Sequence, residues 1–213
     1  MPNQLFHKFL NLTGSPLKAA VVLETGAEET HNHYSIHRPE DILSDTLLKQ
    51  FAALNLTPSN VALFYKIPTA RSLIHYDVGY IDGKWKKNIA AINWNLTGSE
   101  STMCWYEVNE VEVEPDPNPQ EETPPWYFSL NGVHFGYRRN MDIPDEKLRR
   151  LESAEIYGPT LVRTDIAHAV VNADKTGRWA LSVRFDPDFQ SWEHAVSALA
   201  PVTTPTVAAA ESH

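Results

Sequence analysis

His75 and Asp77 are separated by a single residue, Tyr76, in RSLIHYDVGYI (71–81). This segment alternates in polarity and is rich in β-branched and aromatic residues. Such a segment is typical of a β-strand. Residues two apart in a strand point to the same face, so the pattern places an imidazole beside a carboxylate. His168 supplies a second imidazole from a later strand-like segment, PTLVRTDIAHAVVN (159–172). These three side chains are of the types that bind a metal ion.

Two histidines and one carboxylate on one side of a metal form the arrangement that non-haem Fe(II) oxygenases use. Three protein ligands leave three positions of an octahedron open, which is enough for a bidentate oxoacid and for O₂. The metal also keeps net positive charge, which favours an anionic cosubstrate. Arg178 follows His168 by ten residues, across a turn and at the start of RWALSVRF (178–185). Its guanidinium can hold the far carboxylate of such a cosubstrate with two parallel hydrogen bonds.

This order of His-x-Asp, distal His and an Arg ten residues later resembles the Fe(II)/2-oxoglutarate-dependent dioxygenases, in which it recurs on a double-stranded β-helix. The resemblance extends over roughly residues 60–187. The sequence is similar in this respect to the small aspartyl/asparaginyl hydroxylase-like oxygenases and to relatives in bacteriophage genomes. The segments that carry it are SLIHYDVG, AINWNLTGSESTMCWYE, GPTLVRTDIAHAVVN and RWALSVRF.

The resemblance implies that His75, Asp77 and His168 hold the iron and form the catalytic centre. It also implies contacts to the 2-oxoglutarate cosubstrate from Arg178, Ser182, Arg184, Asn93 and Asn95. Arg178 would pair with the C5 carboxylate and Ser182 would add a hydrogen bond. Arg184 is the alternative anchor if the strand register shifts, although it could instead form a salt bridge with Asp186. Halogenating relatives lack the carboxylate ligand, so Asp77 favours hydroxylation or desaturation.

The activity that the resemblance implies is hydroxylation of an unactivated C–H bond with Fe(II), 2-oxoglutarate and O₂, yielding succinate and CO₂. The sequence does not identify the substrate, and a small molecule or a peptide side chain fits equally well. Two alternatives stay open. One is a cupin-like metal dioxygenase that uses no oxoacid. The other is a non-catalytic jelly-roll module, binding or structural, that keeps a vestigial metal site.

The elements that must position these residues are mainly strands. We expect strands at 61–67, 71–81, 88–96, 102–114, 126–137, 159–172 and 178–185, with a possible first strand at 18–23. Helical spacing predicts a helix over 40–54 and a short helix or helical turn over 145–154. Residues 24–37 are expected to form a loop. Many short strands with one or two flanking N-terminal helices predict a mostly β, double-stranded β-helix (jelly roll, cupin-like).

The whole chain, residues 1–213, is expected to form a single oxygenase domain. Its parts would be an N-terminal flanking segment (1–58), a jelly-roll core (59–190) and a flexible tail (197–213). Asp77 and His168 are 91 residues apart, which is longer than in compact members of the resembled family. The proline-rich acidic stretch 115–125 accounts for part of this as an exposed loop, where such enzymes often carry a segment that covers the substrate.

The formal net charge of −9 disfavours nucleic acid as a partner, because phosphate contacts require a basic face. Cys104 is the only cysteine, which excludes an intrachain disulfide and a multi-thiolate zinc site and fits a reducing compartment. No segment has the roughly 20 apolar residues of a membrane helix and no secretory signal is present, so we expect a cytoplasmic protein without membrane contact.

A second histidine cluster, formed by His31, His33 and His37, has no third ligand at a diagnostic spacing. We interpret it as part of a polar loop, with a metal site or a substrate entrance as alternatives. Taken singly, the main candidates also have ordinary interpretations. His75 could simply hydrogen-bond to Asp77, and a lone strand histidine such as His168 need not bind metal. Only their combination with Arg178 favours iron.

Overall fold

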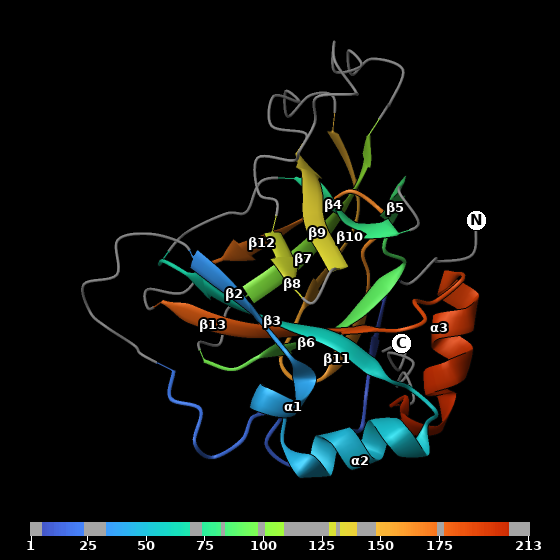
Figure 1. Cartoon of the computed structure of the whole chain (residues 1–213). Coiled ribbons are helices and arrows are strands. Elements are labelled where there is room, and N and C mark those ends of the chain that lie inside the picture. Colours follow the sequence, from blue (N-terminus) through green and yellow to red (C-terminus); the bar gives the residue numbers. More distant parts are fainter. Residues whose placement is uncertain are drawn as a thin grey trace, which may run out of the picture.

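A computed structural model describes most of the chain (Figure 1). The described residues are 6–23, 33–68, 74–81, 84–97, 101–108, 128–130, 133–139, 148–173 and 177–204. The predicted loop at 115–125 and residues 205–213 of the predicted tail lie outside these ranges.

The helices are few and short: α1 (Pro39–Ile42), α2 (Asp45–Ala53), α3 (Trp192–Leu199) and the 3-10 turn η2 (Ala200–Val202). The strands up to the middle of the chain are β1 (His7–Phe9), β2 (His33–His37), β3 (Pro58–Lys66), β4 (His75–Ile81), β5 (Lys84–Lys87), β6 (Ala90–Asn95) and β7 (Ser101–Val108). The later strands are β8 (Phe128–Leu130), β9 (Val133–Arg139), β10 (Leu148–Glu155), β11 (Thr160–Arg163), β12 (His168–Asn172) and β13 (Arg178–Phe185).

The strands form two antiparallel sheets. The first has the order β1-β11-β6-β13-β3-β2 and the second β10-β7-β12-β4-β9-β8, with β5 paired to β4. If β3, β4, β6, β7, β10, β11, β12 and β13 are counted one to eight in chain order, the first sheet contains the run 1-8-3-6 and the second the run 2-7-4-5. This interleaving of early and late strands is the winding of a jelly roll, so the predicted fold class is confirmed.

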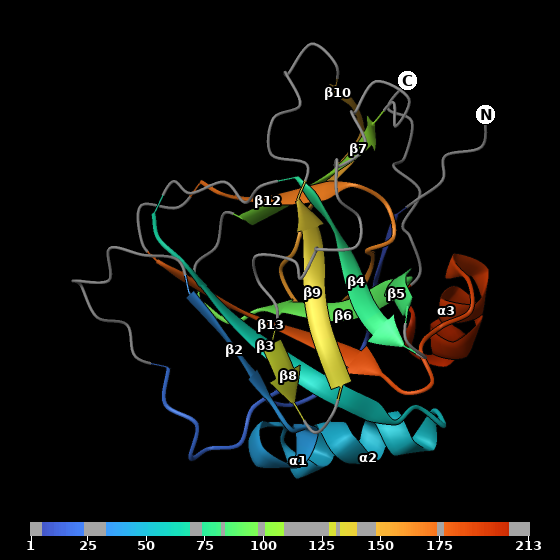
Figure 2. The ribbon, with the colours of Figure 1, turned by 45° about the horizontal axis from the view of Figure 1, so that its top comes forward.

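The helices cover the outer face of the first sheet, whereas the second sheet lies on its other side (Figures 1 and 2). The largest apolar core lies in this helix–sheet layer and includes Leu47 and Phe51 of α2, Leu181 and Val183 of β13, and Leu199 of α3. A smaller apolar cluster, Phe6, Ala91, Met103, Trp105, Ala154, Ile156 and Val162, brings together side chains from both sheets. That cluster fills only one end of the space between the sheets. Arg178, Ser182 and Arg184 of β13 and Asn93 of β6 also face this space, beside the apolar Ala62, Phe64 and Ala180.

The predicted helix over 40–54 is divided into α1 and α2. Leu43 and Ser44 are extended between them, and Leu43 is fully buried. Ser44 is the N-cap of α2, because its hydroxyl accepts a hydrogen bond from the Leu47 amide at 3.3 Å. The same hydroxyl donates to the Ser15 carbonyl. A serine in the middle of an apolar helical pattern therefore marks the start of a second helix.

Replacing Ser44 by Ala removes both hydrogen bonds and leaves an N-terminal amide of α2 without its cap. We expect the free energy of unfolding to fall by about 1 kcal/mol, measured by urea denaturation. Thr46→Ala is the matched control, because Thr46 is exposed on the first turn of the same helix. An equal loss in both variants would show that the cap is not the source of the effect.

Several predicted elements differ from the structure. The segment 145–154 is not helical: its residues from Leu148 onward belong to β10, which pairs with β7. Residues 18–23 form no strand. The predicted loop over 24–37 contains β2, which pairs with β3 at the edge of the first sheet. The predicted strand over 159–172 is two strands, β11 and β12, that belong to different sheets.

The C-terminal part of the chain is also more ordered than predicted. Residues 197–199 complete α3, whose Leu199 is fully buried, and η2 follows directly. Thr203 then forms an isolated β-bridge with Leu10 near the other end of the described chain. Burial of Leu199 against the outer face of the first sheet explains why this Ala- and Thr-rich segment is held.

The hairpin β8–β9 lies between the fourth and fifth core strands in the sequence and extends the second sheet beside β4. Among the described residues, the long interval between Asp77 and His168 therefore contains three strands outside the eight counted above, β5, β8 and β9, and the proline-rich stretch lies in the same interval. β9 pairs with β4 along the residues that follow His75, so the insertion runs alongside the strand that carries the first two candidate ligands.

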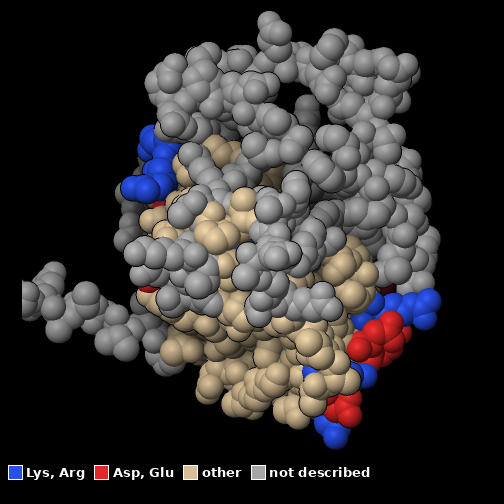
Figure 3. All heavy atoms as spheres, turned by 90° about the vertical axis from the view of Figure 1, so that its left-hand side faces the viewer, with Lys and Arg blue, Asp and Glu red and all other residues tan. Residues whose placement is uncertain are grey.

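Charge is distributed without a continuous basic stripe on the side of the molecule shown in Figure 3, as far as its described residues go. Acidic and basic side chains lie there in small groups near the edges, and uncharged residues lie between them. No helix in the described ranges is both long and apolar enough to span a bilayer.

Candidate metal centre

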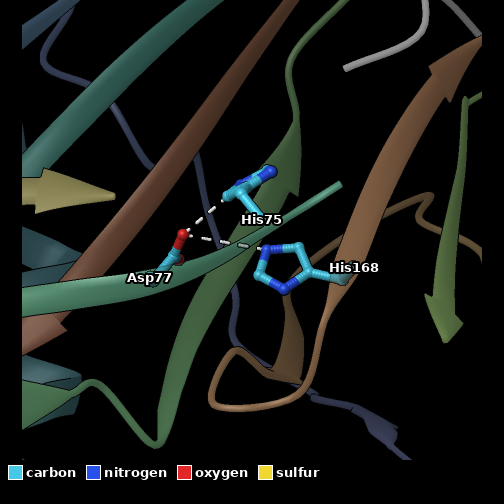
Figure 4. Close-up of side chains that lie close together, drawn as sticks. All are labelled: His75, Asp77 and His168. Atoms are coloured by element: carbon cyan, nitrogen blue, oxygen red, sulfur yellow. Dashed lines mark ion pairs between the residues drawn. The ribbon is translucent and has the colours of Figure 1, made fainter. Parts of the chain in front are cut away.

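His75, Asp77 and His168 converge between the two sheets, as Figure 4 shows. His75 and Asp77 lie two residues apart on β4 and therefore share a face. His168 is the first residue of β12 and is paired directly with His75 across the two strands. One ligand-type atom from each of the three residues lies within 4.8 Å of the others. No other such group of three is found among the described residues.

The distances within this group suit the ligands of a single ion. Asp77 Oδ1 is 3.4 Å from His75 Nε2 and 3.7 Å from His168 Nε2. Ligand atoms bound at right angles with bonds of about 2.1 Å would be about 3.0 Å apart, so only a small closure is needed. The two imidazole rings are 4.4 Å apart between centroids.

The orientation of His168 is fixed by its own backbone. Its Nδ1 lies 2.8 Å from the Ile166 carbonyl, which can only accept a hydrogen bond, so Nδ1 carries the proton. Nε2 is then left with a lone pair directed towards Asp77. A backbone carbonyl that binds the other ring nitrogen and selects the tautomer in this way is the usual support of a metal-binding histidine.

Burial lowers the pKa of His168 to about 4, with a further decrease from His75 that the Asp77 carboxylate offsets only in part. His168 is only 3% exposed. It is therefore neutral at physiological pH, and the neutral imidazole is the form that binds a metal ion.

Asp77 is held in the charged form. Burial alone would raise its pKa, but the Arg184 guanidinium and the two histidines outweigh that effect and keep the pKa of the carboxyl well below its usual range. The carboxylate is thus ready to bind a cation at neutral pH, with no proton to displace.

Arg184 holds the oxygen of Asp77 that faces away from the histidines. Its Nη2 forms an ion pair with Asp77 Oδ2, while its Nη1 donates to the Ala90 carbonyl at 3.3 Å and to Thr164 Oγ1 at 3.0 Å. Thr164 in turn donates to the Asn88 carbonyl at 2.8 Å. The guanidinium is therefore fixed on three sides. Oδ1 of Asp77 remains directed at the histidines.

The backbone of Asp77 is fixed as well. β4 and β12 pair only at His75 and His168, after which the Asp77 amide bonds instead to the Thr164 carbonyl at 3.2 Å. The Asp77 carbonyl accepts from the Asn88 amide at 2.9 Å. The two ligand-bearing strands thus diverge immediately beyond the candidate metal position.

The predicted cosubstrate residues gather on the inner face of the first sheet. Arg178, Ser182 and Arg184 alternate along β13, and Asn93 lies opposite Ser182 on the neighbouring strand β6. Asn95 is two residues further along β6, and its Oδ1 accepts from Arg178 Nε at 2.9 Å. The strand register therefore brings all five predicted residues to one face.

Two features of this inner face are incomplete without a further group. Arg178 is only 5% exposed, and burial lowers its pKa to about 10, yet no Asp or Glu in the described ranges forms an ion pair with it. Asn93 Oδ1 is buried and has no hydrogen-bond partner among the described atoms. A buried cation without an anion and an unpaired amide oxygen are both costly, so the face fits an anionic ligand together with a donor such as water.

Sequence reasoning missed two residues of the site. Lys66 lies directly opposite Arg178 on β3, at the end of a run, VALFYK, in which both faces are mainly apolar. Thr164 precedes the short loop to His168 and has no distinctive motif. The role of Arg184 also differs from both predicted roles: it neither stands free as an anchor nor pairs with Asp186, because it is paired with Asp77.

The second histidine cluster is not part of this centre in the described structure. His31 lies outside the described residues. His37 is paired with Val61, whose side chain belongs to the core on the helix side of the first sheet. Its Nε2 lies 2.7 Å from the Ser35 hydroxyl. His37 is thus on the opposite face of the sheet from Arg178 and Ser182.

Comparison with known proteins gives no family. No family model matches the chain, and no curated protein matches its sequence. Among solved structures, peruvianin-I, a cysteine peptidase from Thevetia peruviana latex, is 7% identical with a TM-score of 0.36, covering 76% of this chain and 66% of that one. Vicilins from Corylus avellana and Solanum melongena are 11% and 7% identical, each with a TM-score of 0.33.

The two vicilin matches include 73% and 75% of this chain but only 30% of each vicilin chain. With TM-scores of 0.33 to 0.36, these structures do not establish a family or a function for this chain. Its fold is defined by its own strand order, and its candidate function by the residues between its two sheets.

Proposed function

We propose that this protein is a non-haem Fe(II) oxygenase that uses 2-oxoglutarate and O₂ to hydroxylate an unactivated C–H bond. The observation that carries the proposal is the meeting of His75, Asp77 and His168 together with the buried Arg178, which forms no ion pair with any Asp or Glu in the described ranges. The first group suits a divalent metal with open positions. The second suits the distal carboxylate of an oxoacid.

The donor set fits iron but is shared with catalytic zinc sites, so the buried Arg178 on the neighbouring sheet face is what favours an oxoacid-dependent iron centre. Structural zinc sites use four ligands and calcium sites use oxygen atoms, so neither fits this group. His168 would bind through Nε2 and Asp77 through Oδ1, since Arg184 already holds Oδ2. The protein's part in the chemistry is to fix these atoms and to keep the sites opposite them open.

Bound Fe(II) would supply the activation of O₂, with one oxygen atom entering the substrate as a hydroxyl group and the other entering succinate as 2-oxoglutarate loses CO₂. The chain's own residues bind and orient. Arg178 would pair with the C5 carboxylate, while Ser182 and Asn93 provide a hydroxyl and an unpaired amide oxygen on the same face. A small molecule or a peptide side chain is the proposed class of substrate.

The same observations favour this activity over the two alternatives. A dioxygenase without an oxoacid has no use for a buried arginine that lacks an acidic partner, because an unpaired buried cation destabilises the fold. A vestigial site would have no need to retain the hydrogen bonds that Arg184 donates to the Ala90 carbonyl and to Thr164 Oγ1, which hold the guanidinium against Asp77.

The direct test is succinate formation by the purified full-length chain. The proposed activity predicts that protein, Fe(II), ascorbate, O₂ and 2-oxoglutarate give succinate. Under anaerobic conditions the Fe(II)–2-oxoglutarate complex should show a weak visible charge-transfer band. Consumption of O₂ without succinate would support the oxoacid-independent dioxygenase instead. Absence of both signals in protein that binds Fe(II) would support the non-catalytic module.

Arg178→Met should weaken 2-oxoglutarate binding by about tenfold or more and leave Fe(II) binding unchanged, since a charge-assisted hydrogen bond contributes about 1.5–3 kcal/mol. Titration of the charge-transfer band measures the first effect and Fe(II) titration without oxoacid measures the second. Arg150→Met is the matched control, because Arg150 is exposed on β10. Unchanged 2-oxoglutarate affinity in Arg178→Met would remove Arg178 from the cosubstrate site.

A further inference from the structure

We propose that Lys66 and Arg178 together form a two-cation anion site that selects a dicarboxylic oxoacid over a monocarboxylic one. This inference rests on the proposed function, in that it names the second cation of the cosubstrate site. The juxtaposition that carries it lies at one end of the β3–β13 pair, where Lys66 and Arg178 are directly opposite each other.

The register places both side chains on the inner face of the first sheet. In the antiparallel pair, Arg178 is opposite Lys66, Ala180 is opposite Phe64 and Ser182 is opposite Ala62. Directly opposed residues have Cβ atoms about 4.5–5.5 Å apart and project to the same side. Lys66 therefore shares the face of Arg178 and Ser182, while its neighbour Tyr65 lies with Trp179 in the core on the helix side.

Two like charges in this position are unfavourable unless something negative lies between them. Arg178 is almost completely buried and Lys66 is partly buried. In the described part of the chain neither of them forms an ion pair with an acidic residue. Arg178 donates through Nε to Asn95, and this bond orients the guanidinium without neutralising it.

The protein carries this repulsion at neutral pH. Burial, followed by the neighbouring Arg178, lowers the pKa of Lys66 to about 8, so the ammonium is still mainly protonated at pH 7. An anion bound between the two groups would relieve both the burial and the repulsion. A carboxylate has two oxygens, one for the guanidinium and one for the ammonium, which is the complementary geometry.

The chemical consequence is selection by the distal charge. 2-Oxoglutarate and succinate carry a second carboxylate that can pair with these two cations. A monocarboxylic oxoacid of the same length would leave the buried Arg178 and the partly buried Lys66 without an anion at its methyl end, and a site built for a polar group rejects a ligand that lacks it. Lys66 thus acts as a specificity-determining residue beside the anchor Arg178.

The test compares succinate and butyrate binding by isothermal titration and by thermal shift, using the full-length chain in metal-free buffer. Succinate should bind and raise the melting temperature of the wild-type protein, and butyrate should do neither at the same concentration. Lys66→Met should bind succinate about tenfold more weakly, while Lys66→Arg retains most of the affinity. Lys49→Met, on the exposed face of α2, is the matched control and should behave as wild type.

Stability separates a binding role from a structural one. Without anion, Lys66→Met should melt at a higher temperature than wild type, because it removes a buried charge next to another of the same sign. A lysine that served packing alone would show the reverse, with a lower melting temperature and unchanged succinate affinity, and that result would overturn the inference. Failure of the wild-type protein to distinguish succinate from butyrate would overturn it as well. Succinate binding without iron-dependent turnover would instead leave the anion site standing and remove the proposed function.

Discussion

Replacing His168 by Ala is expected to reduce Fe(II) affinity by at least about 100-fold, because loss of a partner behind a metal ligand already weakens binding by about 10–100-fold and this change removes the ligand itself. His168 is the only one of the three candidate ligands that β12 supplies. Without it, His75 and Asp77 would offer two ligands from one strand. The visible band of the anaerobic Fe(II)–2-oxoglutarate complex and succinate formation should both disappear.

The control for this change is His194→Ala, which removes an exposed imidazole on α3 and should retain the metal and the turnover. Because His168 is buried against Trp105 on the neighbouring strand, the alanine variant could also be less stable. His168→Gln keeps most of the volume and separates the two effects. Fe(II) binding at wild-type affinity by a folded His168→Gln protein would exclude His168 as a ligand.

The metal group was accessible to sequence reasoning because strand periodicity is local. A spacing of two in a strand places His75 and Asp77 on one face regardless of what surrounds them, and RWALSVRF is a strand over the full predicted range, 178–185. The position of His168 opposite His75 was not accessible from spacing alone. It depends on the jelly-roll winding that pairs the second core strand with the seventh. The prediction that His168 joins His75 and Asp77 therefore came from the family resemblance.

The error at β10 has a local cause. The segment DEKLRRLESA has good helix formers and places Leu148 and Leu151 three residues apart, which is a helical spacing. In the structure the register with β7 shifts between Arg150 and Glu152, so Leu151 lies at a bulge. This bulge takes Leu151 out of the strand alternation, so the spacing of the two leucines in the sequence resembles that of a helix. Pairing with β7 overrides the intrinsic preference of the segment.

Sequence analysis identified Arg178 of the proposed anion site but not Lys66, for a different reason. β3 is apolar on both faces, since helices cover one face of the first sheet and the second sheet covers the other. The sequence VALFYK therefore shows no alternation of polar and apolar residues, and its last lysine looks like the solvent-exposed end of a strand. Only the register of β3 against β13 places Lys66 opposite Arg178. Partner strands, rather than composition, decide what lies inside a sandwich.

Arg184→Met is expected to lower both the stability of the metal-free protein and its Fe(II) affinity. Asp77 would stay mostly buried without its guanidinium partner, which should reduce the free energy of unfolding by about 3 kcal/mol, measured by urea denaturation. Oδ2 would also be free to turn towards the metal position, so Fe(II) affinity should fall by about 10–100-fold. Arg163→Met is the matched control, because it breaks the ion pair with Asp165, which spans 2.8 Å between Arg163 Nε and Asp165 Oδ1 and lies outside the metal group.

The loss of stability in Arg184→Met should depend on pH in a defined direction. The pKa of Asp77 is depressed in the folded protein, so its pairing stabilises the fold above the ordinary pKa of an aspartate and this contribution fades as acid protonates the carboxyl. Without Arg184, burial is opposed only by the histidines and the pKa of Asp77 should rise, which lets acid relieve the unpaired charge sooner. The difference between wild type and variant should therefore be largest at neutral pH and should narrow as the pH falls through the raised Asp77 pKa of the variant, because the wild-type carboxyl is still ionised there. A difference that stays constant from neutral to acidic pH would show that Arg184 stabilises the sheet through Ala90 and Thr164 and not through the candidate iron ligand.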